Sequence, residues 1–160
     1  MKSGKAKKRV FSGIQPSGKL HIGHYVGALS LWGELQDTYE SIFCVVDLHA
    51  LTIPEYANPD RLPVKSREVA ALYLACGIDP IKSVVFIQSH IHAHTELTWV
   101  LNCITPVGWL ERMTQYKIKA NQSKSVSAGL FTYPVLQAAD ILLYKQTLYR
   151  WGRTNGNILN

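Results

Sequence analysis

The stretch Ser41-Ile42-Phe43-Cys44-Val45-Val46-Asp47-Leu48 decides the fold class of this 160-residue chain. Its apolar residues run on without alternation, and many are β-branched, which predicts a strand buried on both faces. A second run of this kind occupies Ser83–Ile87, and a shorter one at Val10–Phe11 ends in Gly13. Because such strands, separated by helices, are typical of a parallel sheet covered on both faces, we expect an α/β fold. In a doubly wound sheet of this class, ligands bind beyond the carboxyl ends of the strands.

Helical patterns fill the segments between these strands. The triplet Asn58-Pro59-Asp60 supplies a cap and first-turn residues for a helix that runs to about Cys76 and is closed by Gly77. The polar stretch Ile118–Ser127 has no periodicity and is expected to be a mobile loop. No change of composition marks a domain boundary inside the body of the chain. The other helices are expected at His21–Leu35, Ala93–Cys103, Val107–Tyr116 and Leu130–Tyr144.

The net charge of +6 does not describe the body of the chain. Residues 1–9 carry five basic side chains and no acidic one, and 149–160 carry two more, Arg150 and Arg153. The remaining residues, 10–148, hold ten basic and eleven acidic side chains, a net charge of −1. We therefore treat 1–9 as a basic leader and 10–148 as a neutral body, which disfavours a protein whose whole surface binds nucleic acid.

The cysteine content and the hydropathy indicate the type of cellular compartment in which the chain occurs. Cys44, Cys76 and Cys103 form no C-x-x-C pair, so neither a disulfide framework nor a zinc ribbon is indicated. A reducing compartment fits best, and we expect a cytoplasmic protein. No apolar run approaches the roughly 18–20 residues that a membrane span requires.

The turn after the first apolar run carries the most informative local pattern. Residues 12–18 read Ser-Gly-Ile-Gln-Pro-Ser-Gly, and His21-Ile22-Gly23-His24 follows at the start of a helix. A helix N-terminus offers N–H groups to phosphate, and a glycine there allows close approach, while the two histidines add donors. Neither a Walker loop nor a G-x-G-x-x-G motif is present. On these residues alone, the histidines could equally just cap the helix.

These residues resemble the class I aminoacyl-tRNA synthetases, which carry a His-Ile-Gly-His signature on a Rossmann-like catalytic domain. Within that class the chain resembles the bacterial-type tryptophanyl-tRNA synthetases. Many members of that family have Asn where His24 stands. The matching runs are residues 11–18, 46–52, 110–117 and 132–144, and together they cover about 9–148.

The resemblance implies a role for each matching position. Asp140 matches the carboxylate that accepts the indole N–H of tryptophan, and Lys117 and Lys119 match a mobile loop whose lysine reaches ATP. The alternative for both lysines is a solvated charge run. The implied catalytic residues are His21, His24 and Lys119. The implied ATP-binding residues are Gln15, Pro16, Ser17, Gly23 and His24. The implied tryptophan-binding residues are Asp140, Phe11, Gly13, His49, Gln115 and Tyr133.

The physical chemistry of Asp140 agrees with that role. A carboxylate acceptor in an apolar pocket rejects a side chain that cannot donate, because the acceptor would be left unpaired. The neighbours of Asp140 in residues 138–143 are all apolar, so we expect a buried acid in place of one on a helix surface. For His49, which follows a strand, the alternative is a buried histidine with a structural role only.

The resemblance implies ATP-dependent activation of L-tryptophan to tryptophanyl-adenylate, then transfer to tRNA(Trp). Mg²⁺ would accompany ATP, positioning and charge would supply the catalysis, and the family members form homodimers. Two alternatives stay open. One is a non-catalytic remnant that binds ATP or tryptophan only. The other is an RNA-binding module, which rests on residues 1–9 alone.

Two further patterns are given structural interpretations. His90, His92 and His94 alternate as metal ligands on a strand would, but they straddle a strand-to-helix loop without an acid or cysteine partner. We expect no metal site there. Trp32, Trp99 and Trp109 lie in helical patterns and are expected to pack in the core or in an interface.

The segment 149–160 departs from the family pattern. Family members continue after a segment like residues 144–148 with Val-Pro-Val-Gly-Glu-Asp-Gln. One set of codons for that motif and its continuation, read with its first base dropped, encodes Tyr149 to Asn160. We therefore expect a frameshift that leaves an aberrant tail, and a truncated chain without aminoacylation activity. The coding DNA around codon 148 decides this.

Overall fold

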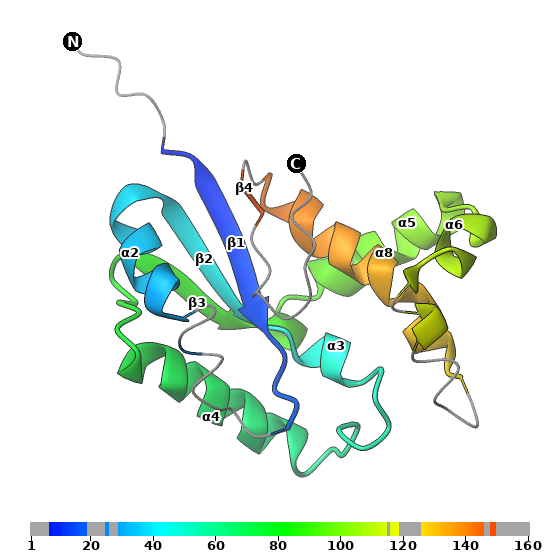
Figure 1. Cartoon of the computed structure of the whole chain (residues 1–160), viewed down its shortest axis with the longest axis horizontal. Helices are drawn as coiled ribbons and strands as arrows, with labels where there is room; N and C mark the ends of the chain where they lie inside the picture. The colour runs from blue at the N-terminus through cyan, green and yellow to red at the C-terminus, as the bar shows by residue number, and fades with distance from the viewer. Residues whose placement is uncertain are drawn as a thin grey trace.

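The computed structural model describes residues 7–18, 25, 29–114, 116–118, 126–145 and 148–149. Its centre is a four-stranded sheet in the order β3-β2-β1-β4, in which every pairing is parallel (Figure 1). The doubly wound parallel α/β fold is therefore confirmed. The strands are β1 (Arg9–Ile14), β2 (Glu40–Val45), β3 (Ser83–Ile87) and the two-residue β4 (Leu148–Tyr149).

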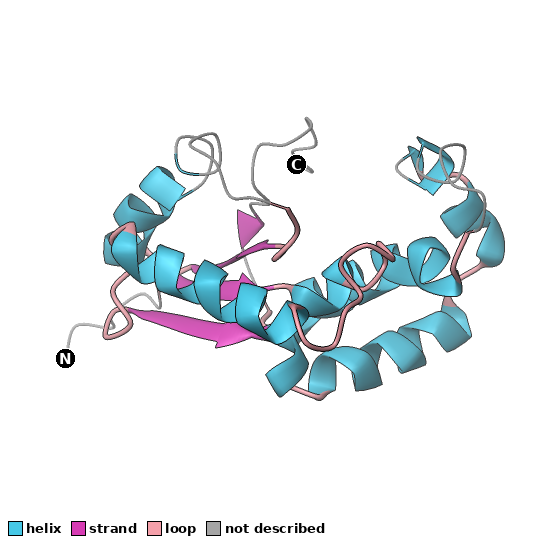
Figure 2. Cartoon of the chain, turned by 90° about the horizontal axis from the view of Figure 1, so that it is seen from below, coloured by secondary structure: helices cyan, strands magenta, loops and turns pink. Residues whose placement is uncertain are grey.

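Helices connect and cover these strands, as the βαβ pattern requires. Two of them, α5 and α8, lie side by side and extend away from the sheet (Figures 1 and 2). The described helices are α2 (Ser30–Thr38), α3 (Asp47–Ala50), α4 (Leu62–Ala75), the 3-10 turn η2 (Gln88–His90), α5 (Ala93–Ile104), α6 (Val107–Glu111) and α8 (Ala128–Leu143).

Both faces of β2 are buried, as its unbroken apolar run predicts. On one face Phe43 stacks on Trp32 of α2, with ring centroids 4.7 Å apart, and the same indole meets Tyr73 of α4 edge-on. On the other face Cys44 clusters with Phe11 of β1, and Phe86 of β3 and Tyr144, at the end of α8, pack against this cluster. Successive side chains of a strand point to opposite faces, so one strand serves both layers.

Several predicted boundaries shift. The strand predicted to reach Leu48 ends at Val45, because Asp47 starts α3 and accepts hydrogen bonds from Ser89 N and Oγ at 3.0 and 2.6 Å. The helix predicted to reach Tyr116 ends at Glu111. Asn58 caps as predicted, but it caps a turn before α4, through Asp60 N and Arg61 N, and the helix itself begins at Leu62.

The predicted end of α4 matches the structure, whereas other predicted segments lie partly outside the described residues. Gly77, with φ +95°, follows α4 and adopts the left-handed conformation that closes helices. The predicted helix from His21 is described only from Ser30 onwards. The expected loop 118–127 and the tail 149–160 lie largely outside the described residues. Leu148 and Tyr149 pair with β1 as a short fourth strand in addition to the three predicted ones.

The basic leader meets the sheet through its last residue. Arg9 opens β1, one residue before the expected start of the body, and its guanidinium contacts Glu40 Oε1 and the carbonyl of Tyr144, both at 2.7 Å. Lys7 donates to the carbonyl of Asp37 at 3.2 Å. These two cations therefore hold elements of the fold together. In the part of the chain that the structure describes, no helix has the length and apolar character to cross a membrane.

A side-chain hydroxyl bridges β1 and β2 near their carboxyl ends. The Tyr73 hydroxyl accepts from Ile14 N at 2.9 Å and donates to the carbonyl of Cys44 at 3.0 Å, fully buried. The hydroxyl therefore stands between β1 and β2 just before the turn at residues 15–18. Next to it, a Cβ on Gly13 would come within 2.8 Å of Val46 Cγ1 and 2.9 Å of the carbonyl oxygen of Cys44, so only glycine fits.

Candidate active site

A buried carboxylate, Asp140, lies at the centre of the candidate site. Its Oδ2 is 2.8 Å from His49 Nε2, and its Oδ1 is 2.6 Å from His94 Nδ1 and 2.7 Å from Gln88 Nε2. The exposed fraction of the Asp140 side chain is zero. A carboxylate can be buried in this way only when donors satisfy it, and here three do.

These donors also set the ionisation of Asp140. Burial raises the pKa of a carboxyl group, but the hydrogen bonds and charges of His49 and His94 lower it by more. The pKa of Asp140 therefore lies below its ordinary value, and the group is a carboxylate at neutral pH. Because a carboxylate only accepts, the nitrogens that face it, His49 Nε2 and His94 Nδ1, carry hydrogen.

His94 links Asp140 to an aromatic wall. Its Nε2 lies 2.9 Å from the Tyr144 hydroxyl. Burial, with Cys44 and Asp140 nearby, raises the pKa of Tyr144 to about 12, so the phenol keeps its proton at neutral pH. The Tyr144 ring stacks on Phe11 of β1, with centroids 5.2 Å apart and planes within 11°.

The fold brings these side chains together from distant elements. His49 belongs to α3, which follows β2, and Gln88 belongs to η2, which follows β3. His94 lies in the first turn of α5, and Asp140 lies on the buried side of α8. The cluster therefore forms at the carboxyl ends of neighbouring parallel strands, where this sheet class is expected to bind ligands.

Several predicted site residues take part in this arrangement. Asp140 and His49 are in direct contact, which makes Asp140 a buried acid as expected. Tyr133 meets the His49 ring edge-on, with centroids 6.4 Å apart, and burial raises the pKa of its hydroxyl. Phe11 reaches the cluster through Tyr144. The residues Gly13, Gln15, Pro16 and Ser17 are described at the end of β1 and in the turn after it, without a contact to Asp140 among the hydrogen bonds of the structure.

Other predicted residues lie outside the described part of the chain. These are His21, Gly23, His24, Gln115 and Lys119. Lys117 is described and exposed. The ATP side of the candidate site therefore remains a prediction from the sequence.

The sequence reasoning missed Gln88 and His94. Both are fully buried polar side chains; Gln88 follows the predicted strand at Ser83–Ile87 directly, and His94 lies in the first turn of the helix after it. A signal was present, because polar residues just after a buried strand lie at the ligand-binding edge of a parallel sheet. The alternation of His94 with His90 and His92 drew attention to metal chemistry instead. His90 and His92 are exposed, and His94 alone of the three is buried.

Within residues 7–18, 29–114 and the other described stretches, no group of His, Cys, Asp and Glu side chains is arranged to hold a metal ion.

The three tryptophans differ in burial, as the three histidines do. Trp32 is a core residue, as predicted, whereas Trp99 and Trp109 are 70% and 61% exposed and do not belong to the core.

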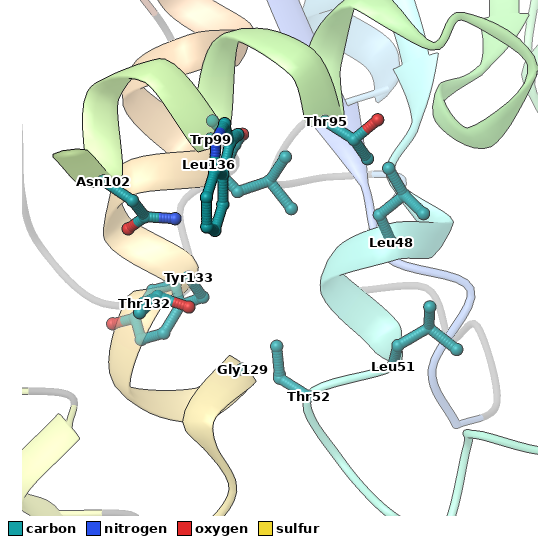
Figure 3. A pocket seen from close by; sticks show the side chains of 11 residues that line it. Leu48, Leu51, Thr52, Thr95, Trp99, Asn102, Gly129, Thr132, Tyr133 and Leu136 are labelled. Carbon is teal, nitrogen blue, oxygen red and sulfur yellow. The ribbon is translucent and has the colours of Figure 1, made fainter.

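Two cavities lie near the cluster without including Asp140. One, of about 330 Å³, opens between α3, α5 and α8 beside Tyr133 and Trp99 (Figure 3). Four threonines line this cavity: Thr52, Thr95, Thr98 and Thr132. Because their hydroxyls donate to backbone carbonyls, the lining of the cavity is mostly apolar. The other, of about 400 Å³, lies between α3, α4 and η2.

The comparisons with known proteins identify the class of this fold and site. The family described as "tRNA synthetases class I (W and Y)" matches residues 2–154, and the chain belongs to that family. Within it, the similarity is to tryptophan–tRNA ligases. The ligase of Gloeobacter violaceus is 60% identical over 144 residues, which cover 89% of this chain and 42% of that protein. The ligase of a Nostoc species is 58% identical over 140 residues, 87% of this chain and 41% of that protein.

Solved structures agree with these sequences. The tryptophanyl-tRNA synthetase of Campylobacter jejuni, complexed with ADP and tryptophan, is 42% identical and has a TM-score of 0.83. That match covers 88% of this chain and 44% of the solved one. The chain thus spans about 42% of the length of the curated relatives it matches.

Proposed function

We propose that this chain is the tryptophan-reading part of a tryptophan–tRNA ligase. In that reaction the carboxylate of L-tryptophan attacks the α-phosphate of ATP, giving tryptophanyl-adenylate and pyrophosphate, and the tryptophanyl group then passes to tRNA(Trp). The observation that carries the proposal is Asp140, a fully buried carboxylate with donors on both oxygens and an aromatic wall nearby.

Asp140 is suited to accept the indole N–H. Each carboxylate oxygen has two lone pairs in its plane, and only one of the two on Oδ2 is used, by His49. An indole N–H donates to the other. A ligand of the same shape without this donor would leave a buried carboxylate oxygen unpaired, which disfavours its binding.

The burial of Asp140 adds a condition to this proposal. Because Asp140 is fully buried, we infer that L-tryptophan binds with a rearrangement of the side chains around it. Phe11, Gly13, His49, Gln115 and Tyr133 complete the proposed tryptophan site. Binding is therefore coupled to a conformational change, and its apparent affinity includes the free energy of that change.

The ATP side of the proposal rests on the turn after β1. Gln15, Pro16, Ser17, Gly23 and His24 are the proposed ATP contacts, with His21, His24 and Lys119 acting on the phosphates. This turn leaves the strand next to the place where the Tyr73 hydroxyl bridges β1 and β2. We also propose that Mg²⁺ binds together with ATP, on its phosphates.

An exposed apolar patch supports a homodimer as part of the proposal. The patch consists of Trp99, Val100 and Ile104 of α5 with Val107 and Trp109 of α6, all more than half exposed. Large apolar side chains exposed on consecutive helices are typical of an interaction site. The proposed location is the cytoplasm, which fits three cysteines without a disulfide.

Calorimetric titration of the chain with L-tryptophan and L-phenylalanine tests the proposed amino-acid site. We expect L-tryptophan to bind, because Asp140 can accept its indole N–H, and L-phenylalanine to bind at least tenfold more weakly. Equal affinities for the two would contradict the role of Asp140. ATP titration, with and without L-tryptophan, tests the nucleotide side in the same experiment.

A further inference from the structure

His94 and Gln88 have no role in the proposed reaction, yet both are fully buried against Asp140. Their donors converge on one atom, Oδ1, at 2.6 and 2.7 Å. An sp² oxygen has two lone pairs in the carboxylate plane, so these two donors saturate Oδ1. Oδ2 has a single donor, His49, at 2.8 Å.

We propose that His94 is a positioning residue that, with Gln88, saturates Oδ1 of Asp140 and leaves one lone pair on Oδ2 as the open acceptor of this carboxylate for a ligand N–H. This inference deepens the proposed function and rests on it for the identity of the ligand. The carboxylate cannot rotate without losing two charge-assisted hydrogen bonds, so the direction of the free lone pair is fixed. His94 itself is held by the Tyr144 hydroxyl on its other nitrogen.

The unpaired atom of Gln88 supports this inference. Its Oε1 is buried without a hydrogen-bond partner in the part of the chain that the structure describes. An unsatisfied buried acceptor destabilises a fold, and an apolar side chain of similar size would avoid it. Glutamine at this position is therefore explained by what its Nε2 does, which is to donate to Asp140.

The contacts fix the tautomer of His94. Its Nδ1 must carry hydrogen, because Asp140 can only accept, and its Nε2 faces a phenol that keeps its proton. Neutral histidine in water prefers the Nε2–H form, so the Nδ1–H form is a signature of this arrangement that mere packing would not produce. The other titratable groups that influence Asp140 are His49, Tyr144 and Cys44.

Nitrogen NMR of the histidine rings tests the inference without any ligand. In the 160-residue chain we expect the neutral His94 ring to be in the Nδ1–H form, and we expect Tyr144→Phe to weaken that preference by removing the Nε2 partner. An Nε2–H form of His94 in the unsubstituted chain would overturn the proposal.

A second measurement follows the ionisation of Asp140 by carbon NMR of its carboxyl group. Removing the donor with His94→Leu is expected to raise the pKa of Asp140, whereas His94→Asn, whose amide nitrogen takes the place of Nδ1, restores it. His92→Leu is the matched control, because His92 is an exposed histidine of the same segment. Equal Asp140 titrations in His94→Leu and His92→Leu would overturn the proposal.

A third measurement compares the affinity of the chain for L-tryptophan with its affinity for β-(3-benzothienyl)-L-alanine, which has sulfur in place of the indole N–H. We expect the preference for L-tryptophan to fall about tenfold in His94→Leu and to persist in His94→Asn and His92→Leu. An unchanged preference in a folded His94→Leu chain would overturn the positioning role. If the unsubstituted chain binds neither compound, the proposed function fails, while the tautomer and the titration still decide whether His94 positions Asp140.

Discussion

His94 Nδ1 lies 2.6 Å from Asp140 Oδ1, and both side chains are completely buried. Forty-six residues separate them in the chain, and they meet because α5 packs along α8. This contact joins the part of the site that the sequence indicates, Asp140, to a residue that the sequence alone assigned to no function.

Replacing Asp140 by asparagine is expected to destabilise the chain by about 3 kcal/mol, because it removes one partner of a buried charged network. The amide keeps the shape of the carboxylate but offers one acceptor oxygen where three donors need partners. Urea unfolding followed by circular dichroism measures this. The control is Asp60→Asn, an exposed acid at the turn before α4. Equal stabilities of the two variants would contradict the account of the network.

The depressed pKa of Asp140 predicts an acid-sensitive stability. A carboxyl group whose pKa is lower in the folded than in the unfolded chain stabilises the fold above the unfolded pKa. That contribution is lost as the pH falls from the ordinary value of 3.8 towards the lower folded pKa. Urea unfolding at several pH values should therefore give a difference between the unsubstituted chain and Asp140→Asn that shrinks below about pH 4. A difference that stays constant down to pH 2 would show that Asp140 is not the group responsible.

Tyr73→Phe is expected to destabilise the chain by about 1–3 kcal/mol. The substitution removes only the hydroxyl, which leaves Ile14 N and the carbonyl of Cys44 without their shared partner. Tyr25→Phe, at an exposed tyrosine, is the matched control and should change the stability little. A Tyr73→Phe chain as stable as the control would mean that β1 and β2 close on each other when the hydroxyl is absent.

Two glycine-to-alanine variants should act in opposite directions. Gly13→Ala is expected to destabilise the chain by about 1–3 kcal/mol, because its Cβ would overlap Val46 and the backbone of Cys44. Gly33→Ala, inside α2 with open space around it, should stabilise the chain by about 0.5–1 kcal/mol. Thermal unfolding of both variants measures the difference, and a tolerated Gly13→Ala would contradict the close approach of the strands.

The exposed patch on α5 and α6 predicts that the association state depends on Trp99. Sedimentation of the chain should show a dimer that Trp99→Glu shifts towards the monomer, because the Trp99 indole, 70% exposed, is the more exposed of the two tryptophans in the patch. Ile81→Glu, at an apolar residue that is 93% exposed away from the patch, is the control. Dissociation by both variants alike, or by neither, would argue against this patch as the interface.

The sheet could be predicted from the sequence because its strands are buried on both faces, so their apolar runs are continuous. Asp140 could be predicted because it is an acid in an apolar helical segment that resembles a family motif. The ends of the strands and helices could not be predicted. For example, β2 ends where Asp47 accepts hydrogen bonds from Ser89, which follows β3. The position of Gln88 after a buried strand indicates the ligand-binding edge, but the contacts of Gln88 and His94 with Asp140, 52 and 46 positions away along the chain, have no local pattern.

The most direct test of the account is the affinity of the chain for L-tryptophan and for β-(3-benzothienyl)-L-alanine, each measured by calorimetry with the unsubstituted chain and with Asp140→Asn. If Asp140 reads the indole N–H, the unsubstituted chain prefers L-tryptophan by at least tenfold, and Asp140→Asn loses most of that preference. Equal affinity of the unsubstituted chain for the two compounds would contradict the account.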